Sequence, residues 1–214
     1  MKTLRPLILL PILLLAACQS HRVTTHVLTD AQPDWDYAET YALAPFDEDM
    51  ETHPRFRTYA DYVERALEPH ELRRIHSPLE ADIVIFLHWD RFRGRPEPIY
   101  VPYRYGATGM TAGANALVEG MAVARARREA NTLQYLLLLR AYDVAAQFET
   151  SRPLIAWETS IMAPAMDSDT HEMLPILLAA ARDDLGRTTG GIQERRIFRR
   201  SATVSYIRTG ERPE

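Results

Sequence analysis

The stretch TLQYLLLLRAYDVAAQFETSRPLIAWETSIM, residues 132–162, decides the fold. It holds two apolar runs, residues 132–144 and 154–162, separated by a turn-like segment. The first run is continuous and predicts a buried strand, whereas the second alternates, with Trp157 and Glu158 on opposite faces. Two strands joined by a short connection form an antiparallel hairpin. Residues 132–162 therefore predict the middle of a β-sheet.

Further strands are predicted on both sides of this hairpin. Residues 81–89 read ADIVIFLHW, a β-branched apolar run that is too short for a free-standing helix and suits a central strand. Residues 21–29 are rich in β-branched side chains and residues 37–44 alternate in polarity, so both predict shorter strands. The arginine-rich tail, residues 188–214, is expected to add an edge strand through residues 203–207.

Two segments have the periodicity of amphipathic helices. In residues 56–67 the apolar side chains recur at spacings of three and four. A second helix opens with Asp169 and Glu172 at the spacing of a capping box, and Pro175 is expected either to kink it or to mark its first turn. The order of elements predicts one α+β domain over residues 22–187, with an antiparallel or mixed sheet and two helices packed on one face.

The N-terminus has the pattern of a bacterial lipoprotein signal peptide. Lys2 and Arg5 precede an apolar run of twelve residues, which is shorter than the ~20 residues that a membrane-spanning helix needs. The run ends in LAAC at residues 15–18, which resembles a lipobox. The resemblance implies cleavage before Cys18, so that residues 1–17 form the signal peptide.

The cysteine of this motif is the only cysteine in the chain. The resemblance implies that the thiol of Cys18 carries a diacylglycerol and that the new amine is acylated. Two or three acyl chains hold a protein firmly, because each buried methylene contributes about 0.8 kcal/mol. Gln19 stands where an aspartate would favour retention in the inner membrane. We therefore expect an outer-membrane lipoprotein that faces the periplasm, with residues 18–21 as a lipidated tether.

Composition excludes several classes of function. The chain after the signal peptide has 23 arginines against 29 acidic residues, a formal charge of −6, which is not that of a nucleic-acid-binding protein. Lys2 is the only lysine, so the mature chain has no lysine for a Schiff base or a Walker-type phosphate loop. With Cys18 acylated, the chain has neither a thiol nucleophile nor a disulfide framework. We expect no cofactor and no metal.

The order of elements and several short phrases resemble the bacterial lipoprotein family called domain of unknown function 4136. The matching phrases are residues 36–43, 72–74, 80–85, 138–143 and 154–157. Together they cover about residues 22–187, and the departures are residues 114–130 and the tail beyond residue 190. The family brings no established catalytic residues. The resemblance implies an envelope lipoprotein that acts as a non-enzymatic binding or structural module.

The alternative is a periplasmic hydrolase whose acid and base groups converge only in space. The sequence has no assembled catalytic motif, since His70 and His171 begin HExxH-like patterns that lack the second histidine. The groups that remain as candidates are His88, Asp90, Asp143, Glu158 and His171. A concave pocket that holds two or more of them favours the hydrolase, whereas a scattered arrangement favours the binding module.

An interaction surface is expected in a long excursion at residues 94–113, which is rich in glycine, proline and tyrosine. The candidate residues are Tyr100, Tyr103, Tyr105, Arg91, Arg93, Arg95 and Arg104. Alternating tyrosines present their rings on one side of an extended segment, and the arginines add positive charge. We expect an anionic envelope component, such as peptidoglycan or phospholipid headgroups, as the partner.

Four further arginines occur in the tail, at positions 195, 196, 199 and 200. One interpretation is a solvated strand face. The other is attraction to anionic lipid headgroups or cell-wall polymer near the anchor.

Overall fold

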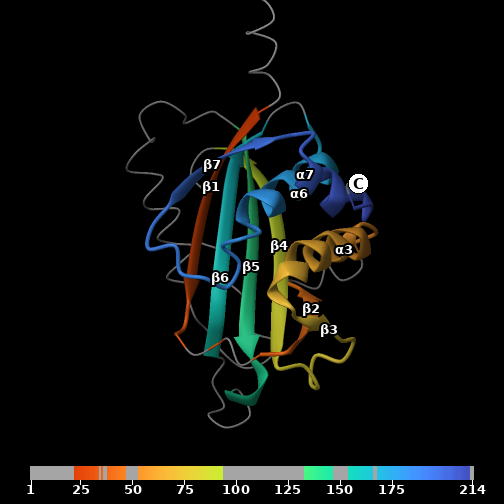
Figure 1. The fold of residues 1–214 in the computed structure, drawn as a ribbon, viewed down its shortest axis with the longest axis vertical. Coiled ribbons are helices and arrows are strands. Elements are labelled where there is room, and N and C mark those ends of the chain that lie inside the picture. The colour runs from red at the N-terminus through yellow and green to blue at the C-terminus, as the bar shows by residue number, and fades with distance from the viewer. Residues whose placement is uncertain are drawn as a thin grey trace, which may run out of the picture.

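The computed structural model describes residues 22–33, 35, 38–46, 53–93, 133–146, 154–165 and 168–212. Its strands are β1 (Arg22–Ala31), β2 (Thr40–Pro45), β3 (Arg73–Arg74), β4 (Ile83–Arg93), β5 (Leu133–Asp143), β6 (Leu154–Pro164) and β7 (Gln193–Phe198). Its helices are α3 (Phe56–Leu67), the 3-10 helix η2 (Glu68–His70), α6 (Thr170–Ala181) and α7 (Ala202–Thr209). The seven strands form one sheet in the order β3-β2-β4-β5-β6-β1-β7 (Figure 1).

The predicted hairpin lies in the middle of this sheet. β5 and β6 are antiparallel, with Leu139 opposite Thr159 and an irregularity in register after Ala141. β4 lies on the other side of β5, where Leu87 faces Leu139. β2 joins β4 in parallel, whereas β1 is antiparallel to both β6 and β7. The prediction of an α+β fold with a mixed sheet is therefore confirmed.

Alternation along the central strands gives the sheet two faces. The side chains of Ile85, Leu137 and Ile161 point to the helix face, where they join one apolar core with α3, α6 and α7. Figure 1 shows these three helices together on one side of the sheet. The neighbouring residues on the strands, such as Leu138 and Arg140, point to the opposite face, and both are fully buried.

Helix α6 begins where the sequence predicts a cap. In α6 the Asp169 carboxylate accepts a hydrogen bond from the backbone N–H of Glu172 at 2.9 Å, which satisfies one of the free donors of the first turn. Pro175 lies inside this helix, so the alternative that it marks the first turn is wrong. In α3 the buried side chains, which include Tyr59 and Val63, follow the predicted spacing.

The C-terminal tail differs from the prediction. The edge strand is β7, which pairs with β1, whereas residues 203–207 lie within α7 and form no strand. The Ser201 side chain caps α7 by accepting from the N–H of Val204, and Gly210 ends the helix with φ of 78°. The described residues thus hold a third α-helix rather than two. Val204 and Ile207, three residues apart, bury its apolar side in the common core.

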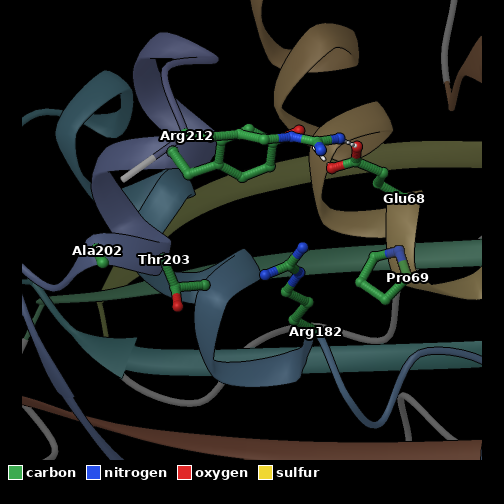
Figure 2. A pocket seen from close by; sticks show the side chains of 7 residues that line it. Glu68, Pro69, Arg182, Ala202, Thr203 and Arg212 are labelled. Carbon is green, nitrogen blue, oxygen red and sulfur yellow. Dashed lines mark hydrogen bonds and ion pairs between the residues drawn. The ribbon is translucent and has the colours of Figure 1, made fainter. Parts of the chain in front are cut away.

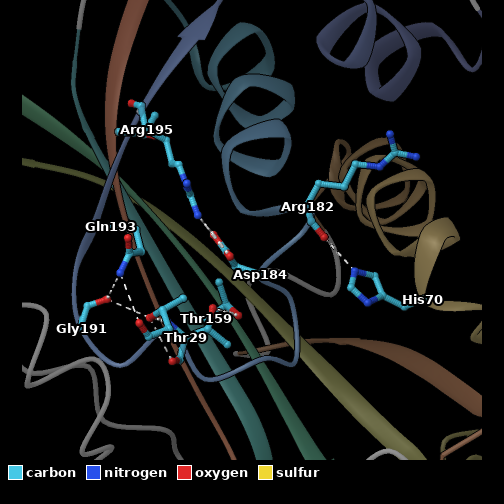
Figure 3. A network of polar contacts seen from close by, with 10 residues as sticks. Thr29, His70, Thr159, Arg182, Asp184, Gly191, Gln193 and Arg195 are labelled. Atoms are coloured by element: carbon cyan, nitrogen blue, oxygen red, sulfur yellow. Dashed lines mark hydrogen bonds and ion pairs between the residues drawn. The ribbon is translucent and has the colours of Figure 1, made fainter.

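The segment between α6 and β7 is fastened to the end of β1 (Figure 3). The N–H of Thr189 donates to the carbonyl of Thr29 at 3.0 Å, and the Thr29 and Thr159 hydroxyls lie 2.9 Å apart. Gly186 has φ of 68°, and a Cβ there would lie 2.2 Å from the ring of Trp35, so the turn requires glycine. In the described part of the chain, no helix has the length and apolar character needed to cross a membrane.

Candidate functional site

A pocket of about 470 Å³ opens where η2, the end of α6 and α7 meet (Figure 2). Its lining residues are Glu68, Pro69, Arg182, Ala202, Thr203, Tyr206 and Arg212. They come from three segments that lie far apart in the sequence. The volume is within the usual range of sites for small molecules.

Hydrogen bonds between the three segments hold the walls of the pocket. The Nε2 atom of His70 lies 2.7 Å from the carbonyl oxygen of Arg182 (Figure 3). Because a carbonyl only accepts, Nε2 carries the proton, and it satisfies a backbone acceptor at the end of α6. The Arg65 guanidinium donates to the carbonyl of Ile207 at 2.8 Å, which ties α3 to the last turn of α7.

Glu68 is the acidic group of the pocket, and its carboxylate already accepts hydrogen bonds from two side chains. The Tyr206 hydroxyl and the Arg212 guanidinium both donate to its carboxylate. The hydrogen bond from Tyr206 is the main cause that lowers the pKa of Glu68, and the same bond raises the pKa of the Tyr206 hydroxyl. Glu68 is therefore an ionised acceptor held by two donors, which does not suit the role of a general base.

Arg182 is the basic group that has no such partner. Its guanidinium forms no hydrogen bond or ion pair with the described residues, and its Nε atom is buried and unsatisfied. The guanidinium carbon lies 5.8 Å from the centroid of the Tyr206 ring, and Figure 2 shows the group pointing into the pocket. Because the charge of Arg212 balances that of Glu68, the charge of Arg182 is not balanced by an acidic residue of the described lining. The described lining therefore has a net positive charge.

The chemistry of this arrangement favours an anionic ligand. A guanidinium offers two parallel N–H donors, which match the spacing of two oxygens of a carboxylate or phosphate. The hydroxyl of Thr203 lies at the same pocket and can donate as well. Ala202, in the first turn of α7, also lines the pocket.

The five acid–base candidates predicted from the sequence do not line this pocket. The carboxylate of Glu158 pairs with Arg140 on the opposite face of the sheet, where both side chains are buried. The ring of His171 lies against the Tyr62 hydroxyl, with Nδ1 at 3.1 Å from it. These groups have structural partners of their own.

The remaining candidates are also dispersed. The Asp143 carboxylate accepts from the N–H of Ala146 at 2.8 Å at the end of β5. Asp90 accepts from the backbone N–H of the next residue. His88 is half-buried on the same sheet face as Glu158, with the centroid of its ring 5.3 Å from that of Phe46. Three of the five, His88, Asp90 and Glu158, thus share a face, and the described pocket holds none of them.

Most of the predicted interaction surface lies outside the described residues. This holds for Tyr100, Tyr103, Tyr105, Arg95 and Arg104, and also for Cys18, the lipidation site expected from the sequence. Arg91 lies near the end of β4, where its guanidinium carbon is 5.6 Å from the centroid of the Tyr135 ring. The backbone of Arg93 forms the last residue of β4. Among the described residues, no group of three or more His, Cys, Asp or Glu is placed to hold a metal ion.

The sequence interpretation missed the pocket residues. Glu68, Arg182 and Tyr206 meet only through tertiary packing, and residues 203–207 were expected in a strand. A signal for the true structure was present, since Ser201 and Gly210 have the N-cap and C-cap chemistry of a short helix.

No protein-family model matches the chain, and no curated protein matches it significantly. Among solved structures, a PDZ domain protein from Parabacteroides distasonis is similar at 14% identity and a TM-score of 0.44, over 86% of this chain and 41% of that one. The chain therefore spans less than half the length of that protein. Two structures of a PelC dodecamer from Paraburkholderia phytofirmans, one of a variant, are similar at 10% and 11% identity, with TM-scores of 0.39 and 0.38. They match 76% and 77% of this chain, and 95% and 97% of their own.

Proposed function

We propose that this protein is a lipid-anchored lipoprotein of the bacterial outer membrane, facing the periplasm, that acts as a non-enzymatic binding module. The lipobox at residues 15–18 supports the anchor, and Gln19 supports sorting to the outer membrane. The resemblance to the lipoprotein family called domain of unknown function 4136 points to the same compartment.

One observation carries the binding role, which is the unpaired guanidinium of Arg182 in a pocket of about 470 Å³. Arg182 is half-buried, and its buried Nε atom has no hydrogen-bond partner, so an anion that accepts from this guanidinium would satisfy it. Glu68 attracts Arg182 electrostatically, but its carboxylate accepts hydrogen bonds from Tyr206 and Arg212. The ligand class that fits is a small molecule or terminal group bearing a carboxylate or phosphate.

The anchor is tested by metabolic labelling with a clickable fatty acid. Cys18→Ala is expected to abolish labelling and to leave the signal peptide uncleaved, because the acylated thiol is the substrate of the lipoprotein signal peptidase. Gln19→Asp is the matched control, which keeps the label and moves the protein to the inner membrane on fractionation. Labelling that persists in Cys18→Ala contradicts the proposal.

The binding role is tested with inorganic phosphate and acetate as probes. Ligands that bind only the native state raise the melting temperature in proportion to the logarithm of their concentration. We expect such a rise for the unsubstituted protein and its loss in Arg182→Gln. Arg187→Gln removes an exposed arginine outside the pocket and serves as the control. Equal responses of the two variants contradict a site at Arg182.

A further inference from the structure

The sheet brings the start of β1 beside the end of β7, which joins the N-terminal tether to the arginine-rich tail. Arg22 lies directly opposite Phe198 in the β1–β7 pair. The guanidinium carbon of Arg22 is 4.3 Å from the centroid of the Phe198 ring, which is 46% exposed. Arg200 follows two residues later and is also exposed. We call Arg22, Phe198 and Arg200 the anchor-proximal surface.

The length of the tether places this surface close to the membrane. Cys18 precedes Arg22 by four residues. A fully extended chain spans at most about 3.6 Å per residue, so the two Cα atoms lie within about 14 Å of each other. When acyl chains hold Cys18 at the bilayer surface, the anchor-proximal surface lies within reach of the headgroups.

The positive charge of this surface is not neutralised by acidic residues of the described chain. Arg195 pairs with Asp184 at 3.0 Å and Arg196 pairs with Glu194 at 3.3 Å, so these two arginines of β7 already have counter-ions. Arg22 and Arg200 make no ion pair among the described residues. Attraction to headgroups therefore depends on these two arginines rather than on those of the strand itself.

The distribution of charge over the molecule favours an orientation in which the anchor-proximal surface faces an anionic membrane. The chain after the signal peptide has a formal charge of −6, so an anionic membrane repels the body as a whole. A locally cationic region is attracted, and the anchor-proximal surface is one that lies beside the tether. The exposed ring of Phe198, which contacts Arg22, can enter the interface between headgroups and acyl chains.

We propose that Arg22, Phe198 and Arg200 dock on anionic phospholipid headgroups and thereby fix the orientation of the domain on the membrane. The proposal rests on the proposed function, since the acylated Cys18 supplies the proximity. Binding to headgroups is nevertheless measurable without acyl chains. All strands and helices that the structure describes begin at or after Arg22, so a chain that starts at residue 18 with Cys18→Ser retains them.

The test is co-sedimentation of this chain with vesicles of phosphatidylcholine alone or mixed with phosphatidylglycerol. Near an anionic surface each arginine strengthens binding about fivefold, so Arg22→Ala with Arg200→Ala is expected to weaken binding to the mixed vesicles by about 25-fold. Raising the salt concentration is expected to remove the difference. Phe198→Ser is expected to weaken binding further, and to do so at high salt as well.

A matched double variant provides the control. Arg73→Ala with Arg187→Ala removes two exposed arginines, one on the edge strand β3 and one beside Thr188, which bonds to the far end of β1 at Ala31. This pair changes the net charge by the same amount and is expected to leave vesicle binding unchanged or slightly weaker. Equal losses in the two double variants overturn the proposal, because the effect is then one of net charge alone.

Two other outcomes also decide the matter. Sedimentation with purified peptidoglycan but with neither kind of vesicle overturns the proposal in favour of cell-wall polymer. Fatty-acid labelling at Cys18 gives a separate result. If labelling fails while vesicle binding still depends on Arg22 and Arg200, the proposed lipid anchor is wrong and the proposed docking surface is retained. If labelling succeeds and the vesicle test fails, the docking surface is wrong and the anchor stands.

Discussion

Along β5 and β6, the two faces of the sheet are both buried, but by different chemistry. On the helix face, Leu87, Leu139 and Ile161 are fully buried in an apolar core. The buried polar residues beside them on the strands are neutral threonines such as Thr29 and Thr159. On the opposite face, the side chains of Arg140 and Glu158 are 0% and 5% exposed and form an ion pair. The comparison shows that alternation along a strand separates the two faces of a sheet. Alternation alone does not show that the face with polar residues is exposed to water.

Because of this ion pair, the face opposite the helices places stricter requirements on its side chains than the helix face does. The Arg140 guanidinium also donates to the Tyr142 hydroxyl at 3.3 Å, and its carbon lies 5.4 Å from the centroid of the Phe46 ring. Apolar packing tolerates changes of shape, whereas a buried charge requires its partner in place. The two faces are therefore expected to respond differently to substitution.

The largest effect is expected from breaking the ion pair on one side. Arg140→Met leaves the Glu158 carboxylate buried without its cation, which is expected to lower the free energy of unfolding by about 3–5 kcal/mol. Urea unfolding measures this loss. The double variant Arg140→Met with Glu158→Leu is the control and is expected to recover most of it, because no charge is then left unpaired. A single variant that loses less than about 1 kcal/mol would falsify the buried pairing.

On the helix face, Leu139→Ala is expected to cost about 3 kcal/mol, from lost burial and the cavity that remains. Because no polar group is exposed by the change, pH is expected to alter this loss little. Leu154→Ala is the matched control, since Leu154 is 46% exposed and its loss is expected to stay below about 0.5 kcal/mol. Similar losses for the two leucines in urea unfolding would contradict the assignment of the core.

A pH-dependent effect is expected where β2 joins β4. The Asp82 carboxylate accepts from the N–H groups of Glu39 and Thr40 at 2.9 and 2.8 Å, and from the Thr40 hydroxyl at 2.8 Å. Burial raises the pKa of Asp82, but these hydrogen bonds outweigh burial and hold the pKa below its ordinary value. Asp82→Ala is therefore expected to cost about 2 kcal/mol at pH 7.

The sign of the pH dependence follows from the lowered pKa. The stabilisation by Asp82 is present above the ordinary pKa of an aspartate, near 3.9, and is lost as pH falls through the lower value of the folded state. The difference between the unsubstituted protein and Asp82→Ala is thus expected to shrink on acidification. Thermal unfolding at pH 7 and pH 3 checks this, and a difference that grows at pH 3 contradicts it.

The smallest of these effects is expected at the start of α6, which covers the helix face. Asp169→Ala removes the acceptor of the Glu172 N–H and is expected to cost about 1 kcal/mol. Asp169→Asn keeps an oxygen acceptor and is expected to retain nearly all of the stability. Chemical unfolding of the two variants separates capping from other roles of Asp169, and equal losses would speak against the cap.

Much of the fold is predictable because its signals are local. The continuous run in β5, the alternation in β6 and the cap at Asp169 each act within a few residues of sequence. The register that places Arg140 against Glu158 is not local, so the sequence leaves Glu158 as a candidate acid rather than as half of a buried pair. The tail supplies the predicted edge strand as β7, but its placement at residues 203–207 is wrong, because these residues alternate like a strand while Ser201 and Gly210 favour a helix.

The candidate site is less predictable than the fold. The pocket depends on Glu68, Arg182 and Tyr206, which occur in segments with no motif of their own. Only the packing of α7 against α6 and η2 brings them together. The lipobox-like motif, in contrast, is a contiguous run of four residues, so its interpretation depends on no tertiary contact.

The position of β1 between β6 and β7 has a consequence for the order in which the chain folds. The Thr25 hydroxyl bonds to the carbonyl of Arg195, 170 residues away, and Thr29 meets Thr159 at a separation of 130 residues. β1 leaves the ribosome first but gains its neighbours last, so sheet completion waits for nearly the whole chain. Such long closures slow folding. The sheet is therefore expected to stay incomplete until β6 and β7 are available to pair with β1.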